Sequence, residues 1–243
     1  MQARLTVEYD GSNYFGWQIQ AGQDSIQARL EDALGRIFST PVRVRGSGRT
    51  DAGVHALGQV AAFSLPRAFE MAELHRALNA LLPPDIVVLG VAQAPDDFDS
   101  RRDARSRVYE YRVLNRAIRS AFEYRYSWQV REPLELDAMN RAARFFLGEH
   151  DFAAFRTLGT EVKSTVRRVL ESGWSRAGER FTYRVEASSF LRHMVRTMVA
   201  AMVEAGRGKC SPETISELLL SRERAAAPAP APPGGLFLIE VRY

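Results

Sequence analysis

The segment Gly46-Ser47-Gly48-Arg49-Thr50-Asp51-Ala52-Gly53-Val54-His55 connects two strand-like runs of residues, 42–47 and 57–64. Its glycines permit positive φ angles and a close approach of other backbone. So many glycines in one strand connection predict a shaped site rather than a plain hairpin. This loop forms the centre of the first half of the chain.

The elements on either side of this loop follow a β-α-β-β-α-β order. Residues 3–9 alternate apolar and polar side chains, as a half-buried strand does. The pair Asp24-Ser25 opens a helix whose apolar residues recur at helical spacing through Ile37. A second helix is predicted near 70–81, and a strand over 86–91 follows it.

The second half repeats this order of elements. Strands are predicted over 107–114, 164–174, 180–188 and 236–243, and helices over 136–147, 190–205 and after Ser211, which we expect to cap the last helix. The sequence therefore predicts an α+β fold of two β-α-β-β-α-β halves, residues 1–103 and 104–243. Each half should be an antiparallel sheet with helices on one face, which leaves the other faces to form an RNA-binding cleft between and across the sheets.

Composition limits the class of protein. The chain has 243 residues, 46% hydrophobic, with 33 basic and 29 acidic residues, so a globular core can form. A single cysteine excludes an internal disulfide framework, and the four histidines show no metal-ligand spacing. The charged N-terminus and the short apolar runs predict no signal peptide and no membrane span, hence a soluble cytoplasmic protein.

Basic residues are unevenly distributed. Residues 101–131 contain nine arginines and three acidic residues, a pattern typical of a nucleic-acid surface. A solvated strand face is the alternative, and a GC-rich genome would also favour arginine.

Asp51 is the candidate reactive group of the glycine-rich loop. No Gly-Lys-Ser/Thr follows the loop, so a phosphate-binding P-loop is excluded. The neighbouring Arg49 favours an ionised carboxylate, which can act as a nucleophile. The residues alone leave open a second interpretation, an aspartate that hydrogen-bonds its own turn.

Longer motifs give the chain a resemblance to a known family. The string Gly48–His55 with Gln59 resembles the signature of the tRNA pseudouridine synthase A family. Further similarity runs in order along nearly the whole chain, at Tyr9-Asp10-Gly11, Gly16-Trp17-Gln18, Asp97-Phe98, Tyr109-Glu110-Tyr111-Arg112, Asp151-Phe152, His193-Met194-Val195-Arg196 and Val241-Arg242-Tyr243.

The resemblance implies an activity and roles for four residues. The family isomerises uridine to pseudouridine at positions 38, 39 and 40 in the anticodon stem-loop of tRNA, as a homodimer and without cofactor or metal. Asp51 matches the catalytic aspartate, Tyr109 the active-site tyrosine, Arg49 the arginine that engages the displaced nucleotide, and Arg196 the ion-pair partner of the aspartate. An Asp51–Arg196 pair would join the two halves of the chain.

Several alternatives remain open at this point. Tyr111 shares the strand face of Tyr109 and competes for its role, and Arg196 could be a surface residue at the edge of a buried helix stripe. We expect His55 to support the loop rather than to act as a base. The competing functions are a non-catalytic RNA-binding protein and a small-molecule hydrolase that uses Asp51 and His55.

Overall fold

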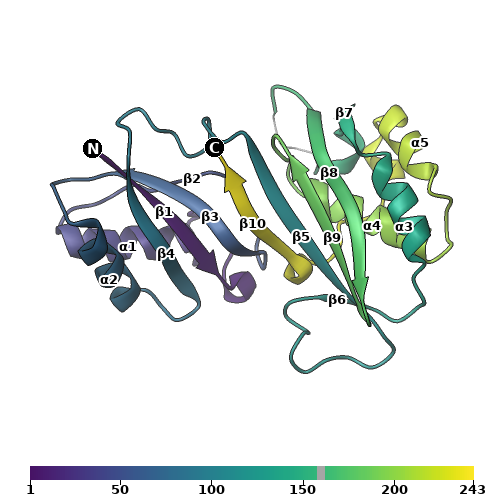
Figure 1. Ribbon diagram of the computed structural model, residues 1–243, viewed down its shortest axis with the longest axis horizontal. Helices are drawn as coiled ribbons and strands as arrows, with labels where there is room; N and C mark the ends of the chain where they lie inside the picture. The colour runs from purple at the N-terminus through teal and green to yellow at the C-terminus, as the bar shows by residue number, and fades with distance from the viewer. Residues whose placement is uncertain (158–161) are drawn as a thin grey trace. The chain divides into compact units, whose positions relative to one another are not determined.

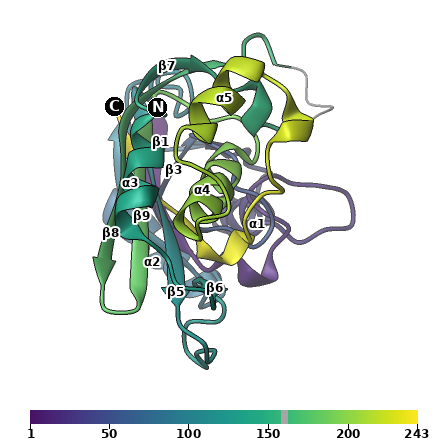
Figure 2. The ribbon, with the colours of Figure 1, turned by 90° about the vertical axis from the view of Figure 1, so that its right-hand side faces the viewer.

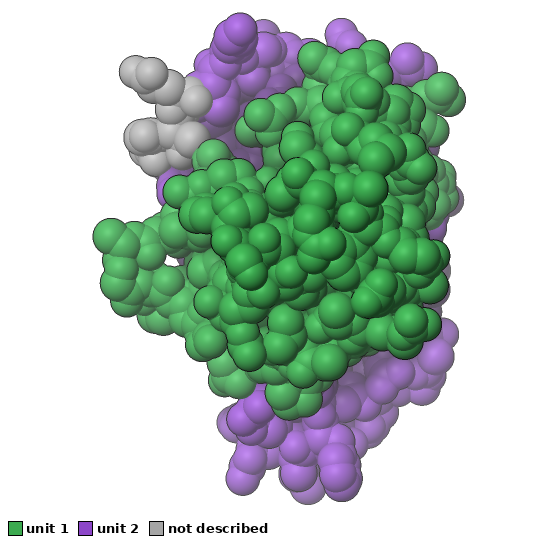
Figure 3. All heavy atoms as spheres, turned by 90° about the vertical axis from the view of Figure 1, so that its left-hand side faces the viewer, with its two compact units in different colours: residues 1–105, 237–243 green, residues 106–236 purple. Residues whose placement is uncertain are grey.

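A computed structural model describes residues 1–157 and 162–243, which form two compact units, coloured separately in Figure 3. Unit 1 comprises Met1–Arg105 and Phe237–Tyr243, and unit 2 comprises Ser106–Leu236. The predicted halves, residues 1–103 and 104–243, place the last strand in the second half. The structure instead places this strand, β10 (Leu236–Arg242), beside β3 (His55–Ser64) of unit 1.

Unit 1 is built on the strand order β4-β1-β3-β10 (Figure 1). β1 (Gln2–Tyr9) pairs antiparallel with both β3 and β4 (Ile86–Ala94), whereas β10 runs parallel to β3. The short β2 (Arg45–Gly46) adds to β3 in the antiparallel sense.

Burial along β1 shows that one face of this sheet is covered. Alternate residues from Ala3 to Tyr9 are buried, while the residues between them stay partly exposed. The helices α1 (Ile26–Phe38) and α2 (Met71–Leu81) supply the covering layer. α1 begins directly after Asp24-Ser25 as predicted, with the side chain of Ser25 as its cap. The apolar spacing seen in the sequence is therefore the buried side of α1.

Unit 2 has the strand order β5-β9-β8-β7, all neighbours antiparallel. These strands are β5 (Ser106–Asn115), β7 (Gly148–Asp151), β8 (Val166–Ala177) and β9 (Arg180–Ala187). A further strand, β6 (Trp128–Val130), pairs parallel with β5. In Figure 2, α4 (Met194–Gly206) and α5 (Thr214–Ser221) lie on one side of the β8–β9 hairpin, and α3 (Leu136–Arg144) is tied to β8 by the Asn140 side chain.

The predicted α+β class is confirmed, but the prediction of purely antiparallel sheets is wrong in part. β10 and β6 each pair in parallel, so the sheet is mixed. β10 pairs with β3, whose residues are far from β10 in the chain, and local periodicity does not reveal such a pairing. β6 is too short to show a period of two.

Three helix boundaries also differ from the predictions. α3 ends before Phe145, because the next residues make tight i−3 bonds that lead to Gly148 at φ 97°. α4 begins at Met194 rather than at 190, because His193 adopts a left-handed φ of 63°. α5 begins at Thr214, and its N-cap residue is Glu213 rather than Ser211.

Over the described residues, no helix is both long enough and apolar enough to cross a membrane.

Candidate active site

The loop that carries Asp51 is held by side chains from the strands beneath it. The Tyr9 hydroxyl of β1 lies 2.8 Å from the Thr50 hydroxyl. Gln59 of β3 donates to the carbonyl of Gly48 (3.0 Å) and accepts from the Ser47 hydroxyl (2.7 Å). These bonds fix the backbone on the N-terminal side of Asp51, whose own side chain remains partly exposed.

A second backbone segment, residues 11–17, packs directly against the loop. The amide of Trp17 donates to the carbonyl of Thr50 (3.1 Å), and the amide of Gly53 donates to the carbonyl of Tyr14 (3.3 Å). Gly16, at φ 86°, has no room for a side chain, because a Cβ would collide with the Thr50 carbonyl and lie 2.9 Å from the Asp51 carbonyl carbon. The backbone around Asp51 is thus in close contact with Gly16, and hydrogen bonds hold its neighbours Thr50 and Gly53.

His55 supports the loop from inside the unit. It is 1% exposed, and its ring stacks on Phe237 with 4.6 Å between the centroids. Its Nδ1 accepts from the amide of Gly11 and lies 3.1 Å from the Asp10 carboxylate. This geometry agrees with the structural role expected for His55 and gives no support to a hydrolase in which it serves as a base.

Burial raises the pKa of Tyr9 to about 12, although its bonds to Thr50 and Gln59 act in the opposite direction. The hydroxyl therefore stays protonated at any physiological pH and can serve as a fixed hydrogen-bonding group under the loop.

This pKa predicts a specific alkaline behaviour. The stabilisation from protonated Tyr9 is complete below pH 10 and is lost as the pH rises towards about 12, because the unfolded chain loses the proton first. In Tyr9→Phe, unfolding in urea should depend less steeply on pH, by about 1.4 kcal/mol per pH unit between pH 10 and 12. An unchanged slope would contradict the buried position of the hydroxyl.

In unit 2, the structure separates the two tyrosines that competed for one role. Tyr111 is fully buried and donates its hydroxyl to the Pro232 carbonyl (2.7 Å), with Gly235 packed against its ring. Tyr109 retains an exposed fraction of 8% and meets the edge of Phe190 with 5.1 Å between the ring centroids. Tyr111 is thus a packing residue, and the active-site role of Tyr109 stays a prediction.

Arg196 lies in the first turn of α4 and is held by a distant segment of unit 2. Its Nε donates to the carbonyl of Ala231 (2.7 Å), whose amide donates to the Arg196 carbonyl (3.0 Å). The side chain is only partly exposed, so it is more constrained than a surface arginine. The predicted Asp51–Arg196 pair involves residues of different units, and it stays a prediction.

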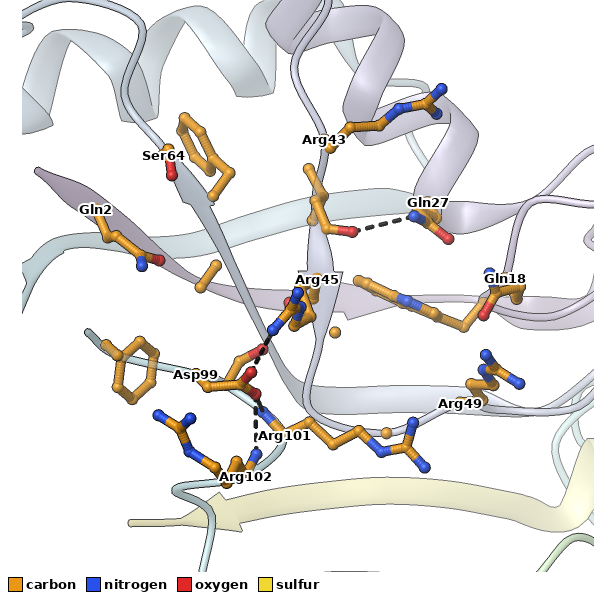
Figure 4. A pocket seen from close by; sticks show the side chains of 18 residues that line it. Gln2, Gln18, Gln27, Arg43, Arg45, Arg49, Ser64, Asp99, Arg101 and Arg102 are labelled. Atoms are coloured by element: carbon orange, nitrogen blue, oxygen red, sulfur yellow. Dashed lines mark hydrogen bonds and ion pairs between the residues drawn. The ribbon is translucent and has the colours of Figure 1, made fainter. Parts of the chain in front are cut away.

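Arg49 is exposed and lines a pocket of about 840 Å³ in unit 1 (Figure 4). The pocket also includes Gly48, the first residue of the signature string, whereas Asp51 is not among the residues that line it. Elsewhere in the described residues, no group of three or more His, Cys, Asp or Glu side chains could hold a metal ion.

A family model described as tRNA pseudouridine synthase matches residues 5–103 and 142–243. The chain belongs to the tRNA pseudouridine synthase family. Proteins named tRNA pseudouridine synthase A resemble it over its full length. The one from Geobacter sulfurreducens is 46% identical and the one from Myxococcus xanthus 44%, each aligned to 99% of this chain and to 98% and 91% of their own lengths, respectively.

Among solved structures, a chain of a Cbf5–Nop10–Gar1 complex covers 82% of this chain and 54% of its own, at 14% identity and a TM-score of 0.33. This likeness is too distant to bear on function.

Membership of the family accounts for the signature loop, but among the groups that support the loop only His55 is predicted from the sequence. Tyr9, Gly11 and Gly16 belong to motifs that carry the family resemblance, but the motifs do not reveal their contacts with the loop. Their role depends on contacts between the loop and the segment 11–17, which spacing along the sequence does not encode.

Proposed function

We propose that this member of the tRNA pseudouridine synthase family isomerises uridine at positions 38, 39 and 40 in the anticodon stem-loop of tRNA. The observation that carries the proposal is the fixed loop that presents the partly exposed Asp51 within the signature Gly48–His55. The full-length resemblance to proteins named tRNA pseudouridine synthase A supports it.

Asp51 has the chemistry that this isomerisation needs. The C1′–N1 bond of uridine breaks, the base turns, and a C1′–C5 bond forms, while C5 releases a proton to solvent and N1 takes one up. A carboxylate can add to an electron-poor carbon and later depart. Attack at C1′, attack at C6 and a glycal route all require a charged carboxylate on a rigid loop.

The other three residues are proposed to bind the substrate. Tyr109 offers an aromatic ring for the displaced pyrimidine. Arg49 engages the displaced nucleotide or a nearby phosphate, and Arg196 pairs with the Asp51 carboxylate and orients it. No cofactor or metal is required, because nothing is oxidised and no group leaves.

The proposed role of Tyr109 predicts a clear contrast with Tyr111. Tyr109→Leu removes a stacking partner worth about 1–3 kcal/mol, so kcat/KM should fall by about 5- to 150-fold. Tyr111→Phe leaves the Pro232 carbonyl without its hydroxyl donor and should cost about 1 kcal/mol in the free energy of unfolding. Steady-state kinetics and urea unfolding of both variants measure this contrast, and the opposite pattern would assign the role to Tyr111.

We also propose that the protein works in the cytoplasm as a homodimer, as the resemblance implies. Sedimentation equilibrium should then give a mass of twice 27.3 kDa. A mass of 27.3 kDa at micromolar concentration would contradict the dimer.

The position of the modified uridines can be tested with tRNA transcripts that carry uridine at only one of positions 38, 39 and 40. Each should gain pseudouridine at that position, and a transcript with cytidine at all three should gain none. Modification of the last transcript to the same extent would overturn the proposed specificity.

A further inference from the structure

The pocket beside the catalytic loop is strongly basic. Of the described residues that line it, five are arginines (Arg43, Arg45, Arg49, Arg101 and Arg102) and one, Asp99, is acidic. The arginines come from two segments, one at 43–49 that runs into the glycine-rich loop and the other at 98–102 (Figure 4). The residues of unit 1 include slightly more acidic than basic side chains, so the positive charge of the pocket is a local concentration.

The sequence produces this arrangement through a simple alternation. Val42 and Val44 are buried in the core, so Arg43 between them and Arg45 after them point outwards. The residues that line the pocket also include Gln2 and Ser64, which pair across β1 and β3, and Gln2 alternates with the buried residues of β1.

Asp99 shapes the second segment. Its carboxylate accepts from the amides of Arg101 and Arg102, each at 2.9 Å, and forms an ion pair with Arg45. These bonds, the Arg102 amide foremost, hold the pKa of Asp99 below its usual range. Since the Ser100 hydroxyl also donates to the Arg45 carbonyl (2.7 Å), the two arginine-bearing segments are locked together.

Positive charge remains in excess when neighbouring acids are counted. Arg43 pairs with Glu31 at 2.9 Å, and Arg102 pairs with Asp103 at 3.2 Å. With Asp99, these make three carboxylates against five guanidinium groups. The side chains of Arg43 and Arg102 are 84% and 72% exposed, so a ligand can reach them despite these pairs.

We propose that this pocket, the arginine pocket, binds the phosphodiester backbone of the substrate RNA next to the nucleotide that Asp51 modifies. Guanidinium groups match the planar, bidentate hydrogen bonding of phosphate oxygens. Arg49 belongs both to the pocket and to the catalytic loop, so a strand bound here continues towards Asp51. The assignment rests on the proposed function and adds Arg43 and Arg102 to the substrate-binding residues.

The test compares two double variants with equal loss of charge. Arg43→Gln/Arg102→Gln removes two exposed pocket arginines, and Arg36→Gln/Arg76→Gln removes two exposed arginines of α1 and α2 outside the pocket. The affinity for unmodified tRNA transcript is measured by fluorescence anisotropy from 50 to 300 mM salt. Circular dichroism and thermal unfolding verify that both variants are folded.

For the pocket variant we expect affinity to fall about tenfold, and the slope of log K against log salt to decrease by about two. In the control variant, Arg36→Gln/Arg76→Gln, the same slope should decrease by less than half of the decrease seen in the pocket variant. Equal effects in the two variants would overturn the proposal, because charge alone would then explain them.

Two further measurements distinguish an RNA-backbone site from a small-anion site, and a failure of the pocket proposal from a failure of the proposed function. Replacing chloride with inorganic phosphate at constant ionic strength should not displace tRNA selectively from the wild type. Selective displacement that is absent in the pocket variant would identify a small-anion site and overturn the RNA assignment. Pseudouridine formation is followed in parallel, so a wild type that binds through the pocket but forms no pseudouridine would refute the proposed function and not the pocket.

Discussion

Asp51→Asn should reduce the rate of pseudouridine formation by about 10⁴-fold, equivalent to about 5 kcal/mol of lost transition-state stabilisation. The amide has the shape of the carboxylate but neither its charge nor its nucleophilicity. Single-turnover reactions with excess enzyme, followed by chromatography of the digested nucleosides, measure the chemical step without the contribution of product release.

The fold and the affinity for tRNA should survive this change. Asp51 is partly exposed, so its replacement should shift the unfolding temperature by no more than a few degrees. Asp32→Asn, an exposed change on α1, is the matched control and should keep the full rate. If Asp51→Asn retained more than about a tenth of the wild-type rate, Asp51 could not be the catalytic carboxylate.

Gly16→Ala should damage both stability and catalysis, although residue 16 carries no reactive group. The backbone at φ 86° disfavours any side chain, and the added Cβ would collide with the Thr50 carbonyl. We expect a loss of about 3–4 kcal/mol in the free energy of unfolding. Since the collision displaces the backbone at Asp51, kcat should also fall by about 100-fold.

Gly22→Ala separates the effect of the positive φ from the effect of the collision with the loop. Gly22 also has a positive φ, of 72°, but a Cβ there meets nothing within 4 Å. This variant should lose only about 1 kcal/mol and keep its activity. Urea unfolding and steady-state kinetics of both variants give the comparison, and equal losses would mean that contact with the loop is unimportant.

Local patterns in the sequence predicted the individual elements well, because these depend on neighbouring residues. The apolar spacing of α1 and its start after Asp24-Ser25 are confirmed, as is the alternation along β1. The pairing of β10 with β3 could not be predicted in this way. It joins residues about 180 positions apart in the chain, and its parallel direction depends on how the chain returns to unit 1.

The sequence identified the signature loop but not what surrounds it. Counting charges drew attention to residues 101–131, whereas the arginine pocket combines Arg101 and Arg102 with Arg43 and Arg45 from a part of the chain that is acidic overall. Only the fold brings the two segments together, through Asp99 and Ser100. The resemblance pointed to Tyr109 rather than Tyr111, and the packing role of Tyr111 through the Pro232 carbonyl became visible only in the fold.

The most direct test of the proposed function uses tRNA transcript with tritium at C5 of uridine. The bond between C5 and the sugar can form only if that hydrogen leaves, so pseudouridine formation must release the label into water. Wild-type protein without added metal or cofactor should release it from the uridines at positions 38–40. Failure to release tritium from tRNA that is demonstrably bound would show that the protein binds RNA without isomerising it.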